Sequence, residues 1–284
     1  MDKITPEQLT TLFDQLVAEG TIVYGPHTSH TVHDEGYPME FRICPSLTKK
    51  PHTVGASNDS FSHTRKWGPG SDLFCPDERL VLCQVNGTHD LALNLFCVDR
   101  PQLLMVTRDS YRRQHEPLDE DDFTVMLELM RTWEGWYVIF NCGEKGGCSR
   151  VHKHVQGLKG PPQAFAALLK AERGEGAVPF KFFLQRFDEG FQGVSVQRVI
   201  EIYEQMLAKC RVALGLEEGE TCPHNVVLWD DCIVVIPRRK GIWEGASANT
   251  GGMMGSVWVP DQEEMDKWTR LGCANVLREL GVQR

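Results

Sequence analysis

The sequence predicts a fold that mixes α-helices with paired β-strands. Two hairpins indicate the strands: one turns at Asn86-Gly87, and the other turns at Asp230-Asp231 between two apolar runs. Apolar residues at helical spacing indicate the helices, most clearly over residues 195–214. The chain therefore combines amphipathic helices with hairpins.

Composition narrows the class of protein. The chain has 284 residues, enough for one large domain or two small ones, and 41% of them are hydrophobic, as in ordinary soluble globular proteins. A net charge of −9 argues against a nucleic-acid polymer as partner, although a local basic site can still bind a small polyanion. No apolar run approaches the roughly 18 residues that a membrane span needs, so we expect no membrane association.

Ten cysteines raise the question of a disulfide scaffold. The polar start, Met1-Asp-Lys-Ile-Thr-Pro, does not resemble a signal peptide, and the sequence contains no Cys-x-x-Cys pair. We therefore expect free thiols and a cytoplasmic location, with the nucleus as an alternative.

The N-terminal half begins with an N-cap at Thr5 and an apolar helical stripe that stops at Gly20. His27, His30 and His33 follow at intervals of three, and we interpret them as part of a solvated loop rather than a metal cluster. The polar residues 52–72 predict a mobile loop or lid. We expect a helix over 117–133 and strands over 21–24, 37–47, 79–85, 91–98, 103–106 and 136–140.

The C-terminal half contains a glycine-rich break at 174–176, which is the best internal boundary. A strand near 180–187 is nevertheless expected to return to the same sheet. We further expect a hairpin over 223–236 that ends in the basic run 237–240, and helices after Pro161-Pro162, over 195–214 and over 263–280.

The stretch 141–156 carries the clearest chemical pattern. A loop containing Gly143, Gly146 and Gly147 precedes polar residues at every second position, namely His152, His154 and Gln156. Alternate residues of a strand share one face, so we expect these three side chains to face a common space. Glycines allow the positive φ angles that turn successive backbone N–H groups toward an anion, and Asn141 and Ser149 add side-chain donors. Phosphate beside imidazoles indicates phosphoryl or nucleotidyl transfer.

Two simpler interpretations of this stretch stay open at this point. A His-x-His pair on a strand can bind a metal ion through both imidazoles, although no carboxylate or third histidine lies nearby in the sequence. The glycine-containing loop by itself could be an ordinary hairpin connection.

The combined pattern resembles a known active-site signature. Asn141-x-Gly143-x-x-x-Gly147-x-Ser149, followed by His152-x-His154-x-Gln156, is similar to that of the fungal-type ATP adenylyltransferases, the diadenosine tetraphosphate (Ap4A) phosphorylases. These form a branch of the histidine-triad superfamily. Galactose-1-phosphate uridylyltransferases share the two histidines and the glutamine but usually have prolines between them, so Lys153 and Val155 favour the adenylyltransferase branch.

The resemblance implies an α+β, histidine-triad-like fold in which helices pack around a mainly antiparallel sheet. It implies one catalytic unit over residues 1–284. Its N-terminal part, about 1–173, would carry the motif, and its C-terminal part, about 177–284, would complete the sheet and the nucleotide site.

The resemblance also implies roles for individual residues. His154 would be the nucleophile that accepts an adenylyl group, His152 a supporting group, and Gln156 an amide donor to a phosphate oxygen. A neutral imidazole suits the first role because it is a good nucleophile near pH 7. The substrate and its phosphates would be bound by Asn141, Gly143, Gly147, Cys148, Ser149, Lys50, Asn94 and Lys240. By the same resemblance, the basic run 237–240 would neutralise phosphates, the alternative being a charged edge of the hairpin.

The expected reaction is the reversible conversion of Ap4A and phosphate to ATP and ADP, with a divalent cation such as Mg²⁺ held mainly by the polyphosphate. Small molecules would then be the partners, and a monomer is expected. Three alternatives are a hexose-1-phosphate uridylyltransferase, a metalloenzyme that uses His152 and His154 as ligands, and a nucleotide sensor without catalytic activity.

Overall fold

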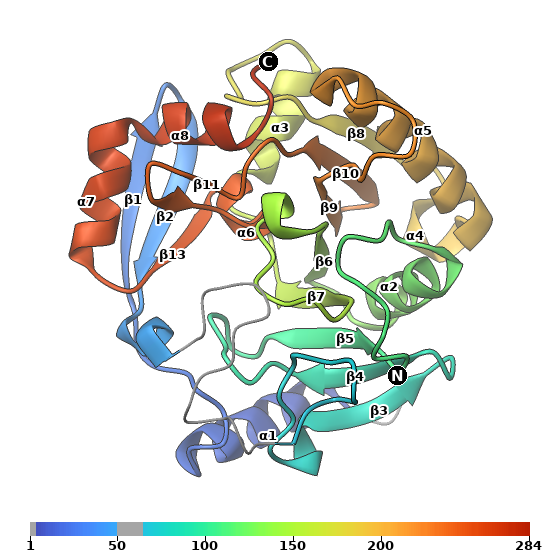
Figure 1. Cartoon of the computed structure of the whole chain (residues 1–284). Helices are drawn as coiled ribbons and strands as arrows, with labels where there is room; N and C mark the ends of the chain where they lie inside the picture. The colour runs from blue at the N-terminus through green and yellow to red at the C-terminus, as the bar shows by residue number, and fades with distance from the viewer. Residues whose placement is uncertain (1–3, 50–64) are drawn as a thin grey trace.

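The computed structural model describes residues 4–49 and 65–284. Its largest sheet has eight strands in the order β3-β4-β5-β7-β6-β9-β10-β8, and all neighbouring strands are antiparallel (Figure 1). The prediction of a mainly antiparallel sheet is confirmed. The strands are β3 (Val81–Val85), β4 (His89–Leu93), β5 (Leu103–Thr107), β6 (Trp136–Asn141), β7 (His154–Lys159), β8 (Phe183–Arg186), β9 (His224–Trp229) and β10 (Cys232–Pro237).

A smaller sheet joins segments from the two ends of the chain. In it, β2 (Tyr37–Ile43) lies between β1 (Thr28–Asp34), which is antiparallel, and β13 (Ser256–Val259), which is parallel. The predicted loop around His30 and His33 is therefore wrong. Glu35 and Gly36 both have positive φ, 49° and 82°, and they form a tight turn that pairs the exposed β1 with β2. A further two-stranded pair is formed by β11 (Ile242–Trp243) and β12 (Ala246–Ser247).

Most helices lie where the apolar spacing predicts them. The predicted helix over 195–214 is confirmed as α5, whereas the predicted C-terminal helix is divided in two. Gly272, with φ of 79°, interrupts the helical hydrogen bonding there and separates α7 from α8. The helices are α1 (Pro6–Ala18), α2 (Glu120–Thr132), α3 (Phe165–Glu172), α4 (Gly190–Gly193), α5 (Val196–Leu214), α6 (Thr250–Met253), α7 (Gln262–Leu271) and α8 (Cys273–Leu280). None of the described helices is long and apolar enough to cross a membrane.

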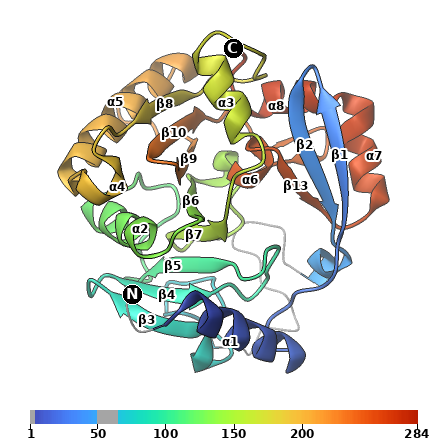
Figure 2. The ribbon, with the colours of Figure 1, turned by 180° about the vertical axis from the view of Figure 1, so that it is seen from behind.

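Both faces of the large sheet are buried at its central strands, whereas the edge strands β3 and β8 are partly exposed. Along β6, Val138 and Phe140 belong to the core that includes α2 and α5, whereas Tyr137 and Ile139 belong to a second core with α3 and α8. This alternation follows the two-residue period of a strand. Figure 2 shows α2, α4 and α5 together along one side of the molecule. Buried on both faces, β6 and its neighbour β7 form a rigid support for the residues at their ends.

The two halves of the chain share the large sheet. β6 from the first half pairs with β9 from the second, as far as Asn141 and Asn225. The strand predicted near 180–187 is confirmed as β8, which pairs with β10 at the sheet edge. The pairing of β6 with β7 ends at Ile139 and Gln156, so these strands separate just where the motif residues begin.

Candidate active site

Gln114 fills the gap where β6 and β7 separate. Its Oε1 accepts a hydrogen bond from the backbone N–H of His154 at 2.8 Å, and its Nε2 donates to the carbonyls of Asn141 (3.0 Å) and His154 (2.9 Å). Only 2% of Gln114 is exposed. This one side chain therefore links the two ends of the motif and holds His154 at a set distance from Asn141.

His154 lies in the wall of a cavity of about 960 Å³. Its Nδ1 lies 2.9 Å from the carbonyl oxygen of His152. A carbonyl can only accept, so Nδ1 carries the proton and the neutral ring has its lone pair on Nε2. The imidazole thus has the tautomer and the orientation of a nucleophile.

His152 does not face the same space as His154 and Gln156, contrary to the expectation from residue alternation. Strand β7 begins only at His154, and the His152 side chain is fully buried away from the cavity. Its Nε2 donates to Thr107 O at 2.9 Å, and its Nδ1 accepts from Ser71 Oγ at 2.7 Å. Burial lowers the pKa of His152, which keeps it neutral. It can support His154 through its carbonyl but lies outside the cavity wall.

Gln156 lines the cavity beside His154. Its Oε1 accepts a hydrogen bond from Gln102 Nε2 at 2.8 Å, which leaves the Nε2 of Gln156 as the group that can serve a ligand. An amide Nε2 donates and cannot accept, so this side chain suits an anionic phosphate oxygen.

Backbone N–H groups of the loop between β6 and β7 form hydrogen bonds within the loop, whereas in an anion nest they would point toward a ligand. The N–H groups of Gly146, Gly147 and Cys148 donate to carbonyls of Gly143 and Glu144 within the loop. The prediction that successive amides of this segment face an anion is therefore wrong for these three. Among the described residues, the amide and hydroxyl of the next residue, Ser149, have no protein partner, and Ser149 lines the cavity.

Gly147 and Cys148 shape this loop. Gly147 has φ of 84°, and a Cβ there would lie 2.4 Å from Ala248 O, so no other residue fits. The Cys148 thiol donates to Arg150 O, and burial raises its pKa to about 12, so it stays protonated. Of the predicted binding residues, Gly147 and Cys148 line the cavity, whereas Gly143 turns the chain at its edge with φ of 70°.

Asn141 is held by the C-terminal half of the chain. Its Oδ1 accepts from Thr250 N (2.7 Å), Thr250 Oγ1 (2.6 Å) and Asn225 Nδ2 (3.3 Å). Asn225 in turn accepts from Arg238 NH1 at 2.6 Å. Because Oδ1 is fully used, the part of Asn141 that can meet a ligand is its Nδ2 amide.

The basic run 237–240 was expected to neutralise phosphates, and for Arg238 this expectation is wrong. Arg238 is fully buried, and its guanidinium donates to the carbonyls of Gly146, Lys240, Ala248 and Leu280 as well as to Asn225. It joins the motif loop to the segment after β10 and takes no part in the cavity wall. Arg239 and Lys240 do line the cavity, and Lys240 Nζ pairs with Glu279 at 2.8 Å.

Asn94 and Lys50 were also predicted to bind the substrate, and the structure describes only the first of them. Asn94 lines the cavity just beyond the end of β4, and its Oδ1 accepts from Phe96 N, so its Nδ2 is oriented for a ligand. Lys50 lies outside the described residues, as does most of the predicted lid over 52–72.

Four residues of the site were missed by the sequence analysis. Asp72 accepts hydrogen bonds from the backbone N–H groups of Val151 and His152, and Arg150 is a buried cation in the cavity wall. Gln102 and Gln114 are isolated glutamines in the sequence. Only Arg150, within the motif, could have been proposed from its position. No group of three or more described residues has the arrangement of a metal site.

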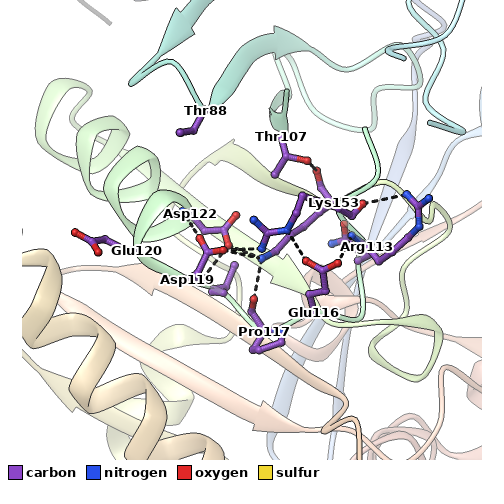
Figure 3. Close-up of polar contacts among 12 residues, drawn as sticks. Thr88, Thr107, Arg113, Glu116, Pro117, Asp119, Glu120, Asp122 and Lys153 are labelled. Carbon is purple, nitrogen blue, oxygen red and sulfur yellow. Dashed lines mark hydrogen bonds and ion pairs between the residues drawn. The ribbon is translucent and has the colours of Figure 1, made fainter. Parts of the chain in front are cut away.

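A cluster of charged side chains lies at the N-terminus of α2 (Figure 3), and none of its members lines the cavity. Lys153 directly precedes β7, and its side chain points to the N-terminus of α2, where Nζ pairs with Asp122 and donates to the carbonyl of Pro117. Asp119 and Glu116 are joined in the same cluster by Arg112. These contacts attach the segment that carries both histidines to a buried helix.

Apolar residues from two different regions of the chain line the cavity. Aromatic and aliphatic residues around β4 and β5 line one part, including Trp67, Phe74 and Leu104; Trp258 and Trp268 of the C-terminal segments line another. These segments lie on different sides of β7 in Figure 1. Lysine and arginine side chains, namely Lys145, Arg150, Arg239 and Lys240, lie among them. A cavity with this lining can bind a polyanion that also carries apolar groups.

Comparison with known families agrees with this geometry. The profile of the Ap4A phosphorylase N-terminal domain matches residues 6–167, and that of the ATP adenylyltransferase C-terminal domain matches residues 176–283. The chain belongs to the Ap4A phosphorylase family. The resemblance inferred from the motif is thereby confirmed. The residues between the two matches, 168–175, contain only part of the glycine-rich break at 174–176.

Relatives of this Ap4A phosphorylase family member are known in yeast. The chain is 27% identical over 270 residues to diadenosine 5',5'''-P1,P4-tetraphosphate phosphorylase 2 of Saccharomyces cerevisiae, covering 80% of this chain and 78% of the relative. The crystal structure of yeast Ap4A phosphorylase Apa2 in complex with Ap4A matches with a TM-score of 0.76 at 21% identity, over 100% of this chain and 99% of that one. The complex with AMP gives 0.75 at 22%, with the same coverage. The expected α+β fold class is confirmed by these matches.

Proposed function

We propose that this chain phosphorolyses Ap4A to ATP and ADP through an adenylyl group carried on His154. Membership of the Ap4A phosphorylase family supports the reaction. The observation that carries the mechanism is the contact of His154 Nδ1 with the His152 carbonyl, because it leaves the nucleophilic lone pair on Nε2 in the cavity wall.

In the first step, His154 Nε2 attacks the α-phosphorus of one adenylyl group. A P–N bond forms, the P–O bond to the bridging oxygen breaks, and ATP leaves. Negative charge develops on the leaving triphosphate, where Arg150, Arg239 and Lys240 can stabilise it. Ser149 and Asn141 add uncharged donors near the reacting phosphate.

In the second step, an oxygen of inorganic phosphate attacks the same phosphorus. The P–N bond breaks, ADP leaves with the incoming phosphate as its β-phosphate, and His154 returns to its starting state. Gln156 Nε2 can donate to the adenylyl phosphate in both steps. It has no acidic proton, so it binds charge without protonating a leaving group.

A divalent cation such as Mg²⁺ fits this cavity as a companion of the substrate. The described residues offer no cluster of three metal-binding side chains, but Glu144 and Glu264 line the cavity. One or two carboxylates with polyphosphate oxygens are the usual Mg²⁺ environment, in which the ion would neutralise phosphate charge.

The test is intact-protein mass spectrometry after brief incubation with Ap4A in the absence of phosphate, at mildly alkaline pH because phosphoramidates are acid-labile. We expect a mass increase of one adenylyl group that added phosphate discharges to ADP. His154→Ala should show no adduct, whereas His30→Ala, a change on the exposed β1, should label like the wild type.

Two outcomes would contradict the proposal. Phosphate-dependent turnover by His154→Ala would rule out a covalent intermediate on His154. Production of a uridylylated enzyme from a uridine diphosphohexose, with no reaction of Ap4A, would instead support the hexose-1-phosphate uridylyltransferase alternative.

A further inference from the structure

A chain of two hydrogen bonds connects a backbone amide to the Gln156 side chain. The N–H of Val98 donates to Gln102 Oε1 at 3.1 Å, and Gln102 Nε2 donates to Gln156 Oε1 at 2.8 Å. Gln102 is 3% exposed, and its own carbonyl accepts from Asn94 N at 2.9 Å. The side chain is therefore almost fully buried where it borders the cavity, and each end of its amide has a hydrogen-bond partner.

This chain determines which end of the Gln156 amide faces the cavity. A backbone N–H can only donate, so the group of Gln102 next to Val98 must be its oxygen. The other end of Gln102 is then the NH₂ group, which requires an acceptor, and this acceptor is the Gln156 oxygen. Gln156 consequently presents its NH₂ group to the cavity. The reverse orientation would place two NH₂ groups against each other.

We propose that Gln102 is a positioning residue that makes the adenylyl enzyme select phosphate over water as acceptor. The inference rests on the proposed function. In the selected path, a phosphate oxygen forms the new P–O bond, the P–N bond to His154 breaks, and ADP leaves. In the competing path, a water oxygen forms that bond, its proton passes to solvent, and AMP leaves.

The orientation of Gln156 acts differently on the two acceptors. An NH₂ group attracts the anionic phosphate and reduces its repulsion from the adenylyl phosphate. A reversed amide would present an oxygen, which repels phosphate but accepts a hydrogen bond from water. Without Gln102 to exclude it, the reversed orientation becomes available, and hydrolysis gains relative to phosphorolysis.

The experiment measures the ratio of ADP to AMP formed from Ap4A at a set phosphate concentration. Gln102→Met keeps the length of the side chain and removes both hydrogen-bonding groups. We expect its ADP:AMP ratio to be about tenfold lower than that of the wild type, the effect of roughly one hydrogen bond to a charged group. This ratio does not depend on the fraction of folded enzyme. Gln185→Met, an exposed change on β8, is the matched control and should leave the ratio unchanged.

A double-substitution cycle tests whether Gln102 acts through Gln156. Gln156→Met should lower the ratio by itself, and adding Gln102→Met should then change it by less than about twofold. An unchanged ratio in Gln102→Met, or an equal drop in the presence of Gln156→Met, would overturn the inference. Gln102→Leu replaces the first variant if that variant fails to fold. Wild-type enzyme that forms neither ATP nor ADP would contradict the proposed function instead.

Discussion

Lys153 Nζ lies 2.6 Å from Asp122 Oδ2, and both side chains are almost completely buried. Lys153 stands between the two histidines of the motif, yet its ammonium group is directed to the N-terminus of α2 (Figure 3). Lys153 is not among the residues that line the cavity. The Asp122 carboxylate also lies 3.2 Å from His89 Nε2. The residue next to His154 thus anchors the start of β7 to the helix α2.

Replacing Lys153 by methionine should strongly destabilise the protein. The substitution leaves the buried Asp122 carboxylate without its cation, and breaking one side of a buried ion pair costs about 3–5 kcal/mol. Urea unfolding measures this loss. Lys170→Met, an exposed change on α3, is the control and should stay within about 0.5 kcal/mol of the wild type. Equal stability of the two variants would contradict this role for Lys153.

His152 should make stability depend on pH in the mildly acidic range. Burial lowers its pKa in the folded protein, whereas the unfolded chain has an ordinary histidine pKa of about 6.5. As pH falls below that value, the unfolded state binds a proton that the folded state excludes, so the free energy of unfolding decreases. Above it, both states are neutral and this contribution is constant.

The corresponding variant is His152→Gln, which removes this titration. The stability that it loses relative to the wild type should become smaller as pH is lowered from about 7 to about 5.5, because only the wild type carries the protonation penalty. Chemical denaturation at several pH values gives the comparison. A difference that does not vary with pH would show that His152 does not contribute in this way.

Gly147→Ala should destabilise the motif loop by more than the cost of a positive φ angle, because the new Cβ would also clash with a neighbouring segment. Gly147 and Gly174 have similar φ values, 84° and 80°, but a Cβ at Gly147 would lie 2.4 Å from Ala248 O, and one at Gly174 would meet nothing within 4 Å. Gly174→Ala should therefore show only the left-handed penalty of about 1–2 kcal/mol. We expect Gly147→Ala to lose clearly more stability in thermal unfolding and most of the adenylylation activity. Similar losses in the two variants would refute the close approach of Ala248.

Arg150→Gln should weaken substrate binding. Arg150 is a buried residue in the cavity wall, and burial lowers the pKa of its guanidinium. Arginine nevertheless stays protonated in proteins, so Arg150 is a cation. Removing the charge should raise the KM for Ap4A about tenfold, as expected for one charge-assisted contact. Steady-state kinetics provide the measurement. Arg173→Gln, an exposed change outside the cavity, should leave KM unaltered, and an equal KM in both variants would exclude a contact between Arg150 and substrate.

The sequence by itself determined the local elements and the chemistry of the motif. Turn residues such as Asn86-Gly87 and the apolar spacing of α5 act over a few neighbouring residues, so they can be read without the fold. The glycines, Ser149 and His154 likewise lie in one continuous stretch, so their pattern can be recognised without knowledge of the fold. The family could be inferred from this stretch because the whole pattern lies within consecutive residues.

Only the tertiary structure decided which polar groups line the cavity and which form hydrogen bonds within the protein interior. His152 and Arg238 have the chemistry of phosphate ligands, yet both are buried by contacts with distant segments. Gln102 and Gln156 are separated by 54 residues, and Asp72 and Val151 by 79. Such pairs form only when β5, β7 and the loops beside them are brought together by burial of the sheet. The partner of a hydrogen-bonding side chain cannot be predicted from that residue alone, because the fold determines which distant residue lies next to it.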